Sequence, residues 1–206
     1  AFVWGSRMTI NPYHGLEDFH FWRKAMTDPA PGQIDTVRQS ALITPQHQVA
    51  TLGSCFAQHV ARHIAASGLQ HLVTERAPPG LPQAQAVAHG YGVFSARYGN
   101  VYTVRQALQL FDRAFGNFRP QEAVWAHDRC FVDAFRPAIQ PGGWAHPDAV
   151  LAQAEQHLAL VRLMFCSFDW LVFTLGLTEA WRSRLDGAVY PLAPGVAGGS
   201  FDPARH

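Results

Sequence analysis

The first regular pattern of apolar and polar positions predicts a strand, a tight turn and a helix. Residues 48–52 are mainly apolar and suit a strand, and Gly53 and Ser54 then interrupt them. Apolar positions follow at a helical spacing, at Phe56, Val60 and Ile64. Gly68 ends the predicted helix, and residues 69–74 form a second predicted strand. A strand, a helix and a strand in this order favour a parallel sheet.

The middle of the chain predicts a loop, a second helix and a small hairpin. Residues 76–90 carry three prolines and two glycines, a composition typical of a surface loop. Thr103 is a suitable N-cap for a helix that Gly116 ends. Two short segments that suit strands, residues 123–126 and 130–135, predict a hairpin.

The C-terminal part of the chain predicts a long helix and then a buried strand. Within residues 146–165 the apolar positions recur at threes and fours, which gives a stripe able to cover one face of a sheet. Residues 170–175 are continuously apolar, as is typical of a central parallel strand that is buried on both faces. This strand ends at the polar, glycine-containing turn of residues 176–179. We therefore expect such a turn at the carboxyl end of two core strands.

Residues 1–46 differ from the rest of the chain. They are rich in Trp, Phe, Pro and polar turn formers and show no sustained period. We expect them to form an irregular N-terminal arm that packs on the core, and residues 47–206 to form one α/β domain. The chain begins at Ala1 and stops at His206 soon after a glycine-rich loop, so we also expect it to be incomplete at both ends.

Composition and charge exclude several classes of partner. The chain has 206 residues, of which 48% are hydrophobic and 15% charged, as in a globular protein. Its formal net charge of +1 and scattered Lys and Arg give no basic stripe, so we expect no nucleic-acid partner. Three cysteines without a CxxC spacing favour a reducing, cytoplasmic location and no structural metal. We also expect no cofactor and no membrane span, because the longest apolar run is residues 170–175. The sequence leaves the oligomeric state open.

Ser54 lies where an α/β sheet commonly binds its ligands, between the carboxyl end of a strand and the start of a helix. Helix N–H groups and the positive end of the helix dipole meet there. Ser54 therefore suits an acyl-transfer nucleophile, and Gly53 allows the tight turn before it. From position alone, capping of the following helix is the more common role of such a serine. The adjacent Cys55 is a second candidate nucleophile, but we expect it to be a small buried packing residue.

A resemblance to a known family starts from the pentapeptide Gly53-Ser54-Cys55-Phe56-Ala57. It matches the signature of the GSCFA family, bacterial proteins whose domain looks like a relative of the SGNH/GDSL hydrolases. Three further segments resemble other recurring segments of that family, namely residues 94–103, 173–181 and 190–195. Because several blocks occur in the right order, the chain is identified as a member of this family from about residue 11 to its end.

This resemblance implies a three-layer α/β/α sandwich with a mainly parallel central sheet, SGNH-hydrolase-like and flavodoxin-like. It also implies that a serine attacks an ester while the N–H of that serine, a glycine N–H and an asparagine side chain hold the oxyanion. Carried over to this sequence, the nucleophile is Ser54 and the glycine is Gly99, with Gly92 as the alternative. The asparagine position carries Thr178, whose shorter hydroxyl donates one hydrogen bond, so Asn100 is a further candidate for this role.

Two departures from the SGNH pattern limit what the resemblance implies. Thr178 is equally suited to cap a helix that begins near Glu179. The Asp-x-x-His block that supplies the acid and the base in SGNH proteins is absent, since Asp202 and His206 are one residue too far apart. We expect the catalytic acid and histidine to lie beyond His206, and the chain alone to hydrolyse esters poorly.

Two functions from different classes follow. The first is an SGNH-type serine esterase or acyltransferase that acts on an O-acyl ester of a small molecule or a carbohydrate. The second is a catalytically silent module that binds a glycan or an acyl ligand in the same pocket, and the loss of the usual asparagine favours it. A nucleotide-binding protein is a weaker third candidate, because no GxGxxG or P-loop pattern follows either predicted strand.

Overall fold

The computed structural model describes most of the chain, namely residues 11–30, 32–33 and 43–206. The chain divides into two compact units, residues 1–42 and 43–206. Parts of the predicted N-terminal arm lie outside the described residues, namely residues 1–10, 31 and 34–42. That the arm packs on the core stays a prediction.

The described part of the first unit contains two short helical turns. A 3₁₀ turn, η1, spans Asp18–His20, and a π-helical turn, η2, spans Arg23–Thr27. Lys24 Nζ lies 2.9 Å from Asp18 Oδ1, which joins the two turns by an exposed ion pair. Exposed ion pairs of this kind contribute about 1 kcal/mol or less, so they fix local geometry only weakly.

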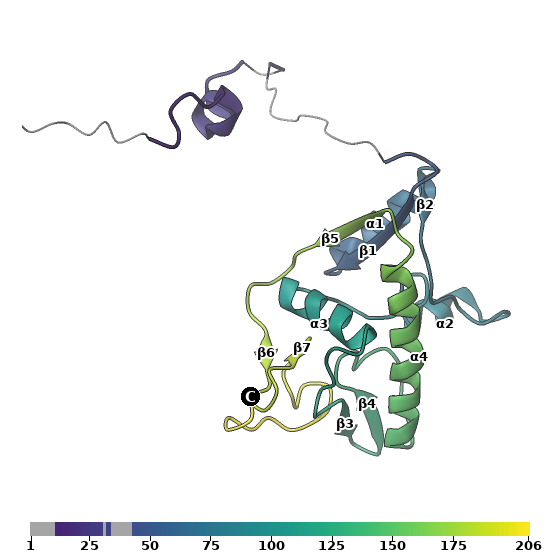
Figure 1. Ribbon diagram of the computed structural model, residues 1–206. Coiled ribbons are helices and arrows are strands. Elements are labelled where there is room, and N and C mark those ends of the chain that lie inside the picture. The colour runs from purple at the N-terminus through teal and green to yellow at the C-terminus, as the bar shows by residue number, and fades with distance from the viewer. Residues whose placement is uncertain (1–10, 31, 34–42) are drawn as a thin grey trace, which may run out of the picture. The chain divides into compact units, whose positions relative to one another are not determined.

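The core of the second unit is a parallel sheet with the strand order β2-β1-β5 (Figure 1). Its strands are β1 (Gln48–Gly53), β2 (Gln70–His71) and β5 (Trp170–Thr174). The pairing of β1 with β5 ends with Gly53 opposite Thr174. This register confirms the predicted parallel sheet and places Ser54 at its carboxyl edge, next to the last residue of β5.

Two helices pack against this sheet, α1 (Phe56–Ala66) and α4 (Pro147–Phe165). α1 connects β1 to β2, whereas α4 leads to β5 on the other side of β1. Right-handed crossovers in opposite directions put the two helices on opposite faces, which is the predicted α/β/α layering. The main core cluster joins the sheet to α4, through Ala50, Leu52, Val161 and Met164.

Two of the predicted strands differ from the observed ones. β5 is half-buried at the edge of the three-stranded sheet, so the expectation of a central strand was wrong. An apolar run shows that a strand is covered but not how many strands flank it. β2 is also shorter than predicted, and an irregular segment continues along β1 in its place. Thr51 N–H donates to Ser95 Oγ at 2.9 Å, and Val101 N–H donates to Gly53 O at 2.8 Å.

The helix predicted after Thr103 is α3 (Val104–Ala114), which packs beside α4. The Thr103 hydroxyl accepts from Gln106 N–H at 3.2 Å, and the Gln106 side chain accepts from Thr103 N–H, which completes a capping box. The loop predicted for residues 76–90 was wrong in part, because it contains the helix α2 (Gln83–Ala88). α2 consists of Ala, Gln and one Val, and the first two favour helices.

The remaining strands of the described residues form two small antiparallel pairs. β3 (Val124–His127) and β4 (Cys130–Asp133) make the predicted hairpin. β6 (Trp181–Arg182) pairs with β7 (Val189–Tyr190). A second core cluster joins these pairs around Trp125 and Tyr190, each of which is 1% exposed.

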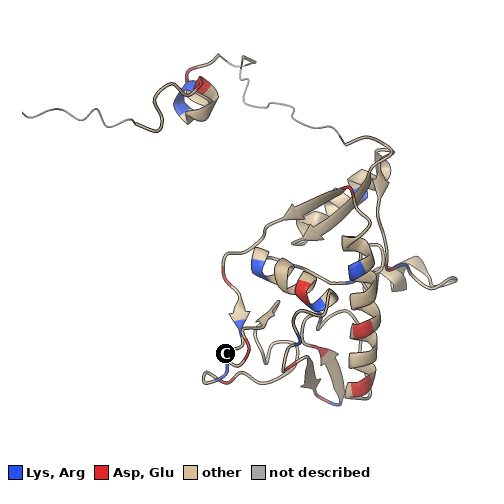
Figure 2. Ribbon diagram, in the orientation of Figure 1, with Lys and Arg blue, Asp and Glu red and all other residues tan. Residues whose placement is uncertain are grey.

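Charged residues are interspersed over the helices, strands and loops of the second unit rather than collected on one element (Figure 2). This agrees with the scattered Lys and Arg of the sequence. Within the described residues, no helix combines the length and the apolar character that crossing a membrane demands.

Candidate functional site

Ser54 is held at the carboxyl end of β1 by the neighbouring strand β5. Its hydroxyl oxygen lies 3.2 Å from Thr174 Oγ1, and its N–H donates to Thr174 O at 3.0 Å. Gly53 makes this approach possible, because it has φ = 141° and a Cβ there would lie 2.4 Å from Thr174 O. Only glycine fits these two conditions. Ser54 is 7% exposed, so the turn holds a buried serine in a fixed place.

The hydroxyl of Ser54 does not cap the helix that follows it. α1 begins at Phe56 with Cys55 as its N-cap residue, and Cys55 makes no side-chain cap bond. Ser54 contributes its carbonyl oxygen, which accepts from Ala57 N–H at 2.9 Å. Helix capping, the more common role of a serine at this position, does not apply to Ser54, because its hydroxyl contacts Thr174 instead.

The first turn of α1 offers backbone donors next to Ser54. Nothing in the described part of the chain accepts from the N–H groups of Cys55 and Phe56. Unpaired N–H groups at a helix N-terminus attract negative charge. The Ser54 N–H, which was the expected oxyanion donor, already donates to Thr174. Cys55 is exposed rather than buried, because α1 begins one residue later and leaves this side chain at the corner of the turn.

Gly176 and Tyr102 close the other side of Ser54. A Cβ on Gly176 would lie 2.7 Å from Ser54 Cβ and 2.9 Å from Tyr102 Cδ1, so the three residues meet at one point. Gly176 N–H donates to Tyr102 O at 3.0 Å, which fixes the turn after β5 against the segment that precedes α3. The turn of residues 176–179 was predicted from the sequence, but a role for Tyr102 was not. The signal for Tyr102 was its place in the block of residues 94–103, which resembles a family segment.

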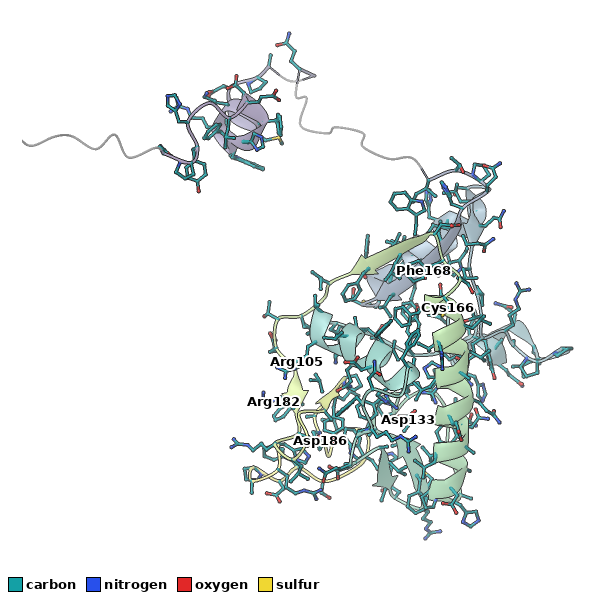
Figure 3. All side chains as sticks on the ribbon, viewed as in Figure 1. Arg105, Asp133, Cys166, Phe168, Arg182 and Asp186 are labelled. Carbon is teal, nitrogen blue, oxygen red and sulfur yellow. The ribbon has the colours of Figure 1, made fainter. Side chains whose placement is uncertain are left out.

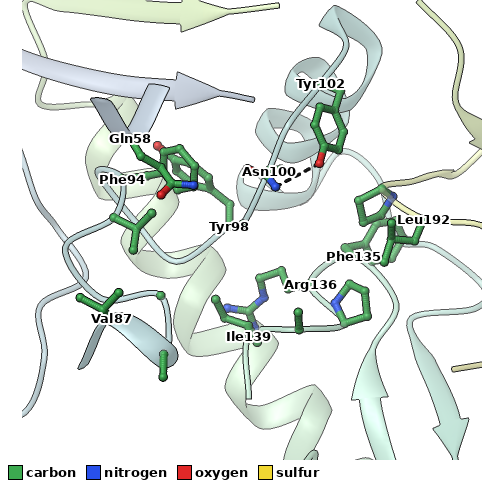
Figure 4. A pocket seen from close by; sticks show the side chains of 17 residues that line it. Gln58, Val87, Phe94, Tyr98, Asn100, Tyr102, Phe135, Arg136, Ile139 and Leu192 are labelled. Atoms are coloured by element: carbon green, nitrogen blue, oxygen red, sulfur yellow. Dashed lines mark hydrogen bonds between the residues drawn. The ribbon is translucent and has the colours of Figure 1, made fainter. Parts of the chain in front are cut away.

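Asn100 and Gly99, two predicted oxyanion groups, lie on a cavity wall beside Tyr102 (Figure 4). Asn100 Nδ2 donates to the Tyr102 hydroxyl at 3.0 Å, and Asn100 Oδ1 is buried with no partner among the described residues. Because the oxygen and nitrogen of an amide can exchange places, the unpartnered end can donate or accept. Gly92, the alternative glycine, is not among the residues that line this cavity.

Thr178 has no described contact with Ser54. It is exposed, and its hydroxyl donates to Glu179 Oε2 at 2.9 Å. The chain runs from β5 to β6 without a helix, so the alternative role of Thr178 as a helix cap was wrong. The threonine that contacts Ser54 is Thr174, the last residue of β5. Thr174 was not predicted, because the family resemblance pointed to the turn after the strand rather than to the last residue of the strand.

In the described residues, no histidine or carboxylate contacts the Ser54 hydroxyl. His71 of β2 contacts Thr51 Oγ1 at 3.0 Å instead. His206 packs edge-on to Tyr190, and its Nε2 lies 3.5 Å from Glu122 Oε2. That the acid and the histidine of a triad lie beyond His206 stays a prediction.

A cavity of about 260 Å³ adjoins these residues. Its wall comes from the first turn of α1, from α2, from residues 93–102, from residues 135–139 and from the segment after β7. Most of its side chains are apolar, among them Val87, Phe94, Phe135, Ile139 and Leu192. Ser54 is not part of the wall, but Tyr102 and Gln58 are. Tyr102 meets Ser54 at Gly176, and Gln58 lies one helical turn after Ser54, so the cavity begins next to the serine.

In and behind this wall lie five buried acidic, basic or histidine side chains, each with 7% exposure or less, which we call the buried charged group: Glu75, Arg97, Asp133, Arg136 and His157. Arg136 Nε donates to Asp133 Oδ2 at 2.7 Å, and Arg136 Nη1 donates to Arg97 O at 3.3 Å. Arg97 N–H donates to Glu75 Oε2 at 2.8 Å, and His157 Nδ1 lies 2.6 Å from the same oxygen. Asp133 is the last residue of β4 and is labelled in Figure 3. None of these five residues belongs to a motif that the sequence shows, so their roles were not predicted.

In the buried charged group, the environment lowers the pKa of the histidine and of both carboxyl groups. Burial lowers the pKa of His157 to about 4, and the charge of Arg136 adds to this, so the ring is neutral at pH 7 and Nδ1–H donates to Glu75. Burial would raise the pKa of Glu75, but hydrogen bonds from His157 and Arg97 bring it below its ordinary value. The pKa of Asp133 is likewise lowered, since the charges of Arg136 and Arg113 outweigh the effect of burial.

The model of one family, described as the GSCFA family, matches residues 48–204. This span runs from the first residue of β1 past β7, so it includes the Ser54 turn and the whole cavity wall. The comparison with curated proteins gave no match, nor did the comparison with solved structures.

Proposed function

We propose that this chain, which belongs to the GSCFA family, is a serine esterase or acyltransferase with Ser54 as its nucleophile. The observation that carries the proposal is the Ser54 turn. A serine that does not cap its helix is held at the carboxyl edge of a parallel sheet, beside unpaired helix N–H groups. Such a position suits attack on a carbonyl carbon whose oxygen becomes negative.

The reaction has two steps. Ser54 Oγ forms a bond to the carbonyl carbon of an ester, the bond from that carbon to the alcohol oxygen breaks, and the alcohol leaves with the proton that Ser54 gave up. Water or a second alcohol then attacks the acyl-serine, which releases an acid or a new ester and restores the Ser54 hydroxyl. The alcohol part of the substrate is a small molecule or a carbohydrate.

The developing oxyanion has three candidate donors. The N–H groups of Cys55 and Phe56 are unpaired within the described residues and follow Ser54 directly. The amide of Asn100 has one end bound to Tyr102 and the other end without a partner among the described residues. Donors of this kind contribute about 3–4 kcal/mol each when they face the oxyanion. A relation to the SGNH hydrolases is part of the proposal, and the serine after the first parallel strand supports it.

One observation favours the second function, a catalytically silent module that binds an acyl or glycan ligand. Neither a histidine nor a carboxylate of the described residues contacts Ser54 Oγ, and its N–H is already bonded to β5. A serine without a base is a weak nucleophile. The same cavity then binds its ligand without reaction.

Labelling of the full-length protein with a fluorophosphonate probe separates the two functions. We expect the probe to attach to Ser54, as located by mass spectrometry of the labelled peptide. Ser54→Ala should abolish labelling. Cys55→Ser and Ser67→Ala should retain it, which controls for the adjacent thiol and for a serine at the other end of α1. An unlabelled protein, or labelling that persists in folded Ser54→Ala, favours the silent module and overturns the proposed nucleophile.

A further inference from the structure

We infer that the cavity beside Ser54 binds the acyl chain of the ester as an apolar hydrocarbon chain of several carbon atoms. The claim that this hydrocarbon chain is part of an ester rests on the proposed function. That the cavity takes an apolar chain rests on the bonding state of its wall, whichever of the two functions holds.

The polar side chains deep in the wall already have partners in the protein. Arg136 donates through Nε to Asp133 and through Nη1 to Arg97 O. The Tyr98 hydroxyl donates to Thr51 O, and burial raises its pKa, so it remains protonated. These groups close hydrogen bonds within the wall and leave little for a ligand to bind, so the wall as a whole behaves as an apolar surface.

The polar groups that remain available are gathered on one side of the cavity. Gln58 makes no side-chain hydrogen bond to the described part of the chain, and Asn100 has one amide end without a partner there. Figure 4 shows Gln58, Asn100 and Tyr102 on one side of the cavity, and Val87 and Ile139 on the other. The polar side is the one that meets Ser54 through Tyr102 and Gly176. A ligand with a polar head near Ser54 and an apolar tail fits this distribution.

The volume and the lining are consistent with such a tail. The cavity holds about 260 Å³, several times the roughly 30 Å³ that a water molecule occupies in the liquid. The apolar side chains of the lining include Val87, Phe94, Phe135, Ile139 and Leu192. A sugar ring would need hydrogen-bond partners around its whole edge, and burying its hydroxyls without them is costly. The carbohydrate, where there is one, therefore lies outside the cavity as the alcohol part of the ester.

Binding of straight-chain primary alcohols tests the inference without any reaction. We would titrate 1-butanol, 1-pentanol, 1-hexanol and 1-octanol into the Ser54→Ala variant and follow the amide signals of residues 87–102 by NMR. Each added methylene should tighten binding about fourfold until the cavity is full, as burial of one methylene predicts. Glucose should not shift these signals. Binding of glucose, or alcohol affinity that does not depend on chain length, overturns the inference.

Filling the cavity provides the matched variants. Ala138 is exposed and lines the cavity, so Ala138→Trp should weaken hexanol binding by tenfold or more while the protein stays folded. Val87→Trp, on the α2 side of the cavity, serves if Ala138→Trp does not fold. Ala84→Trp is the control, because Ala84 is exposed on α2 and does not line the cavity. Equal hexanol affinity in the filled and control variants overturns the assignment of this cavity.

The failure of this inference is distinguishable from failure of the proposed function. If the fluorophosphonate does not label Ser54 but hexanol binds and Ala138→Trp blocks it, the cavity is an acyl-chain site without catalysis at Ser54. If Ser54 is labelled but hexanol does not bind, the nucleophile stands and the acyl chain lies elsewhere. If Ser54 is labelled and hexanol also binds, Ala138→Trp should lower kcat/KM for p-nitrophenyl hexanoate by tenfold or more. The same variant should leave kcat/KM for p-nitrophenyl acetate within about twofold.

Discussion

The Ser54 turn and the buried charged group lie on two sides of one cavity and are built in opposite ways. The turn is made of neutral groups, in which Gly53 and Gly176 allow close contact and the Thr174 hydroxyl meets Ser54. The buried charged group holds ionised side chains removed from water, such as Asp133 at 1% and Arg136 at 5% exposure, together with the neutral ring of His157. One region holds Ser54, the proposed nucleophile, and the other fixes the shape of the wall.

This difference shows where the molecule tolerates change. A buried charge whose partner is removed is left uncompensated, which costs several kcal/mol. A hydroxyl that contacts another hydroxyl contributes about 1 kcal/mol, so it can be removed with the fold intact. Substitutions in the buried charged group should therefore act on stability, whereas those in the Ser54 turn should act on reactivity.

The largest effect is expected from Asp133→Ala. It removes the carboxylate that accepts from Arg136 Nε at 2.7 Å and from Phe135 N–H at 2.9 Å, and it leaves the Arg136 guanidinium buried without its counter-charge. We expect the free energy of unfolding to fall by about 3–5 kcal/mol. Urea denaturation followed by circular dichroism measures this.

Glu155→Ala is the matched control, because Glu155 is an exposed carboxylate on α4. Its removal should change the free energy of unfolding by about 0.5 kcal/mol or less. A loss of similar size in the two variants would mean that the buried charged group is no more important to the fold than the surface, and the comparison would not hold.

Acidification should weaken the buried charged group next. The pKa of His157 is lowered from 6.5 to about 4 in the folded protein, so between these pH values the unfolded chain binds a proton that the folded protein does not. Stability is then complete above about pH 6.5 and falls as the pH drops toward 4. The interval corresponds to up to about 3 kcal/mol. The lowered pKa values of Glu75 and Asp133 act in the same direction at still lower pH.

Urea denaturation at pH 7, 5.5 and 4.5 measures this slope. His157→Gln retains an N–H donor for Glu75 and removes the group that titrates between pH 6.5 and 4, so the variant should lose less stability over that interval. If the two proteins lose stability equally, His157 is not the group responsible.

The comparison also explains which features the sequence predicted. The Ser54 turn and the capping box of α3 depend on residues within a few positions of one another, such as Gly53 with Ser54 and Thr103 with Gln106. Such signals are local, so the sequence shows them. In the buried charged group, Glu75 and His157 are 82 residues apart. Each resembles an ordinary surface residue until the fold brings them together.

The cavity was unpredictable for the same physical reason. Its wall consists of residues from α1, α2, two irregular segments and the chain after β7. No pattern within these segments predicts which of them contact one another. The prediction of which threonine lies next to Ser54 was wrong by four residues. The family resemblance pointed to Thr178 in the turn, but Thr174 faces Ser54 because β1 and β5 pair in a register that sets Gly53 opposite it. The register depends on both strands, so the sequence of one strand alone does not predict it.

The smallest effect on stability, and the sharpest test of the Ser54 turn, is expected from Thr174→Val. This change keeps the branched shape and removes the hydroxyl that lies 3.2 Å from Ser54 Oγ and accepts from Ser54 N–H. We expect about 1 kcal/mol or less in the free energy of unfolding and, because the Ser54 rotamer is no longer fixed, about fivefold slower labelling by the fluorophosphonate. Thr178→Val is the control, since that hydroxyl is exposed and bonded to Glu179. If labelling were slower in Thr178→Val and unchanged in Thr174→Val, Thr178 rather than Thr174 would be the threonine that acts on Ser54. The rate of labelling decides between them, because only a threonine that acts on Ser54 alters it.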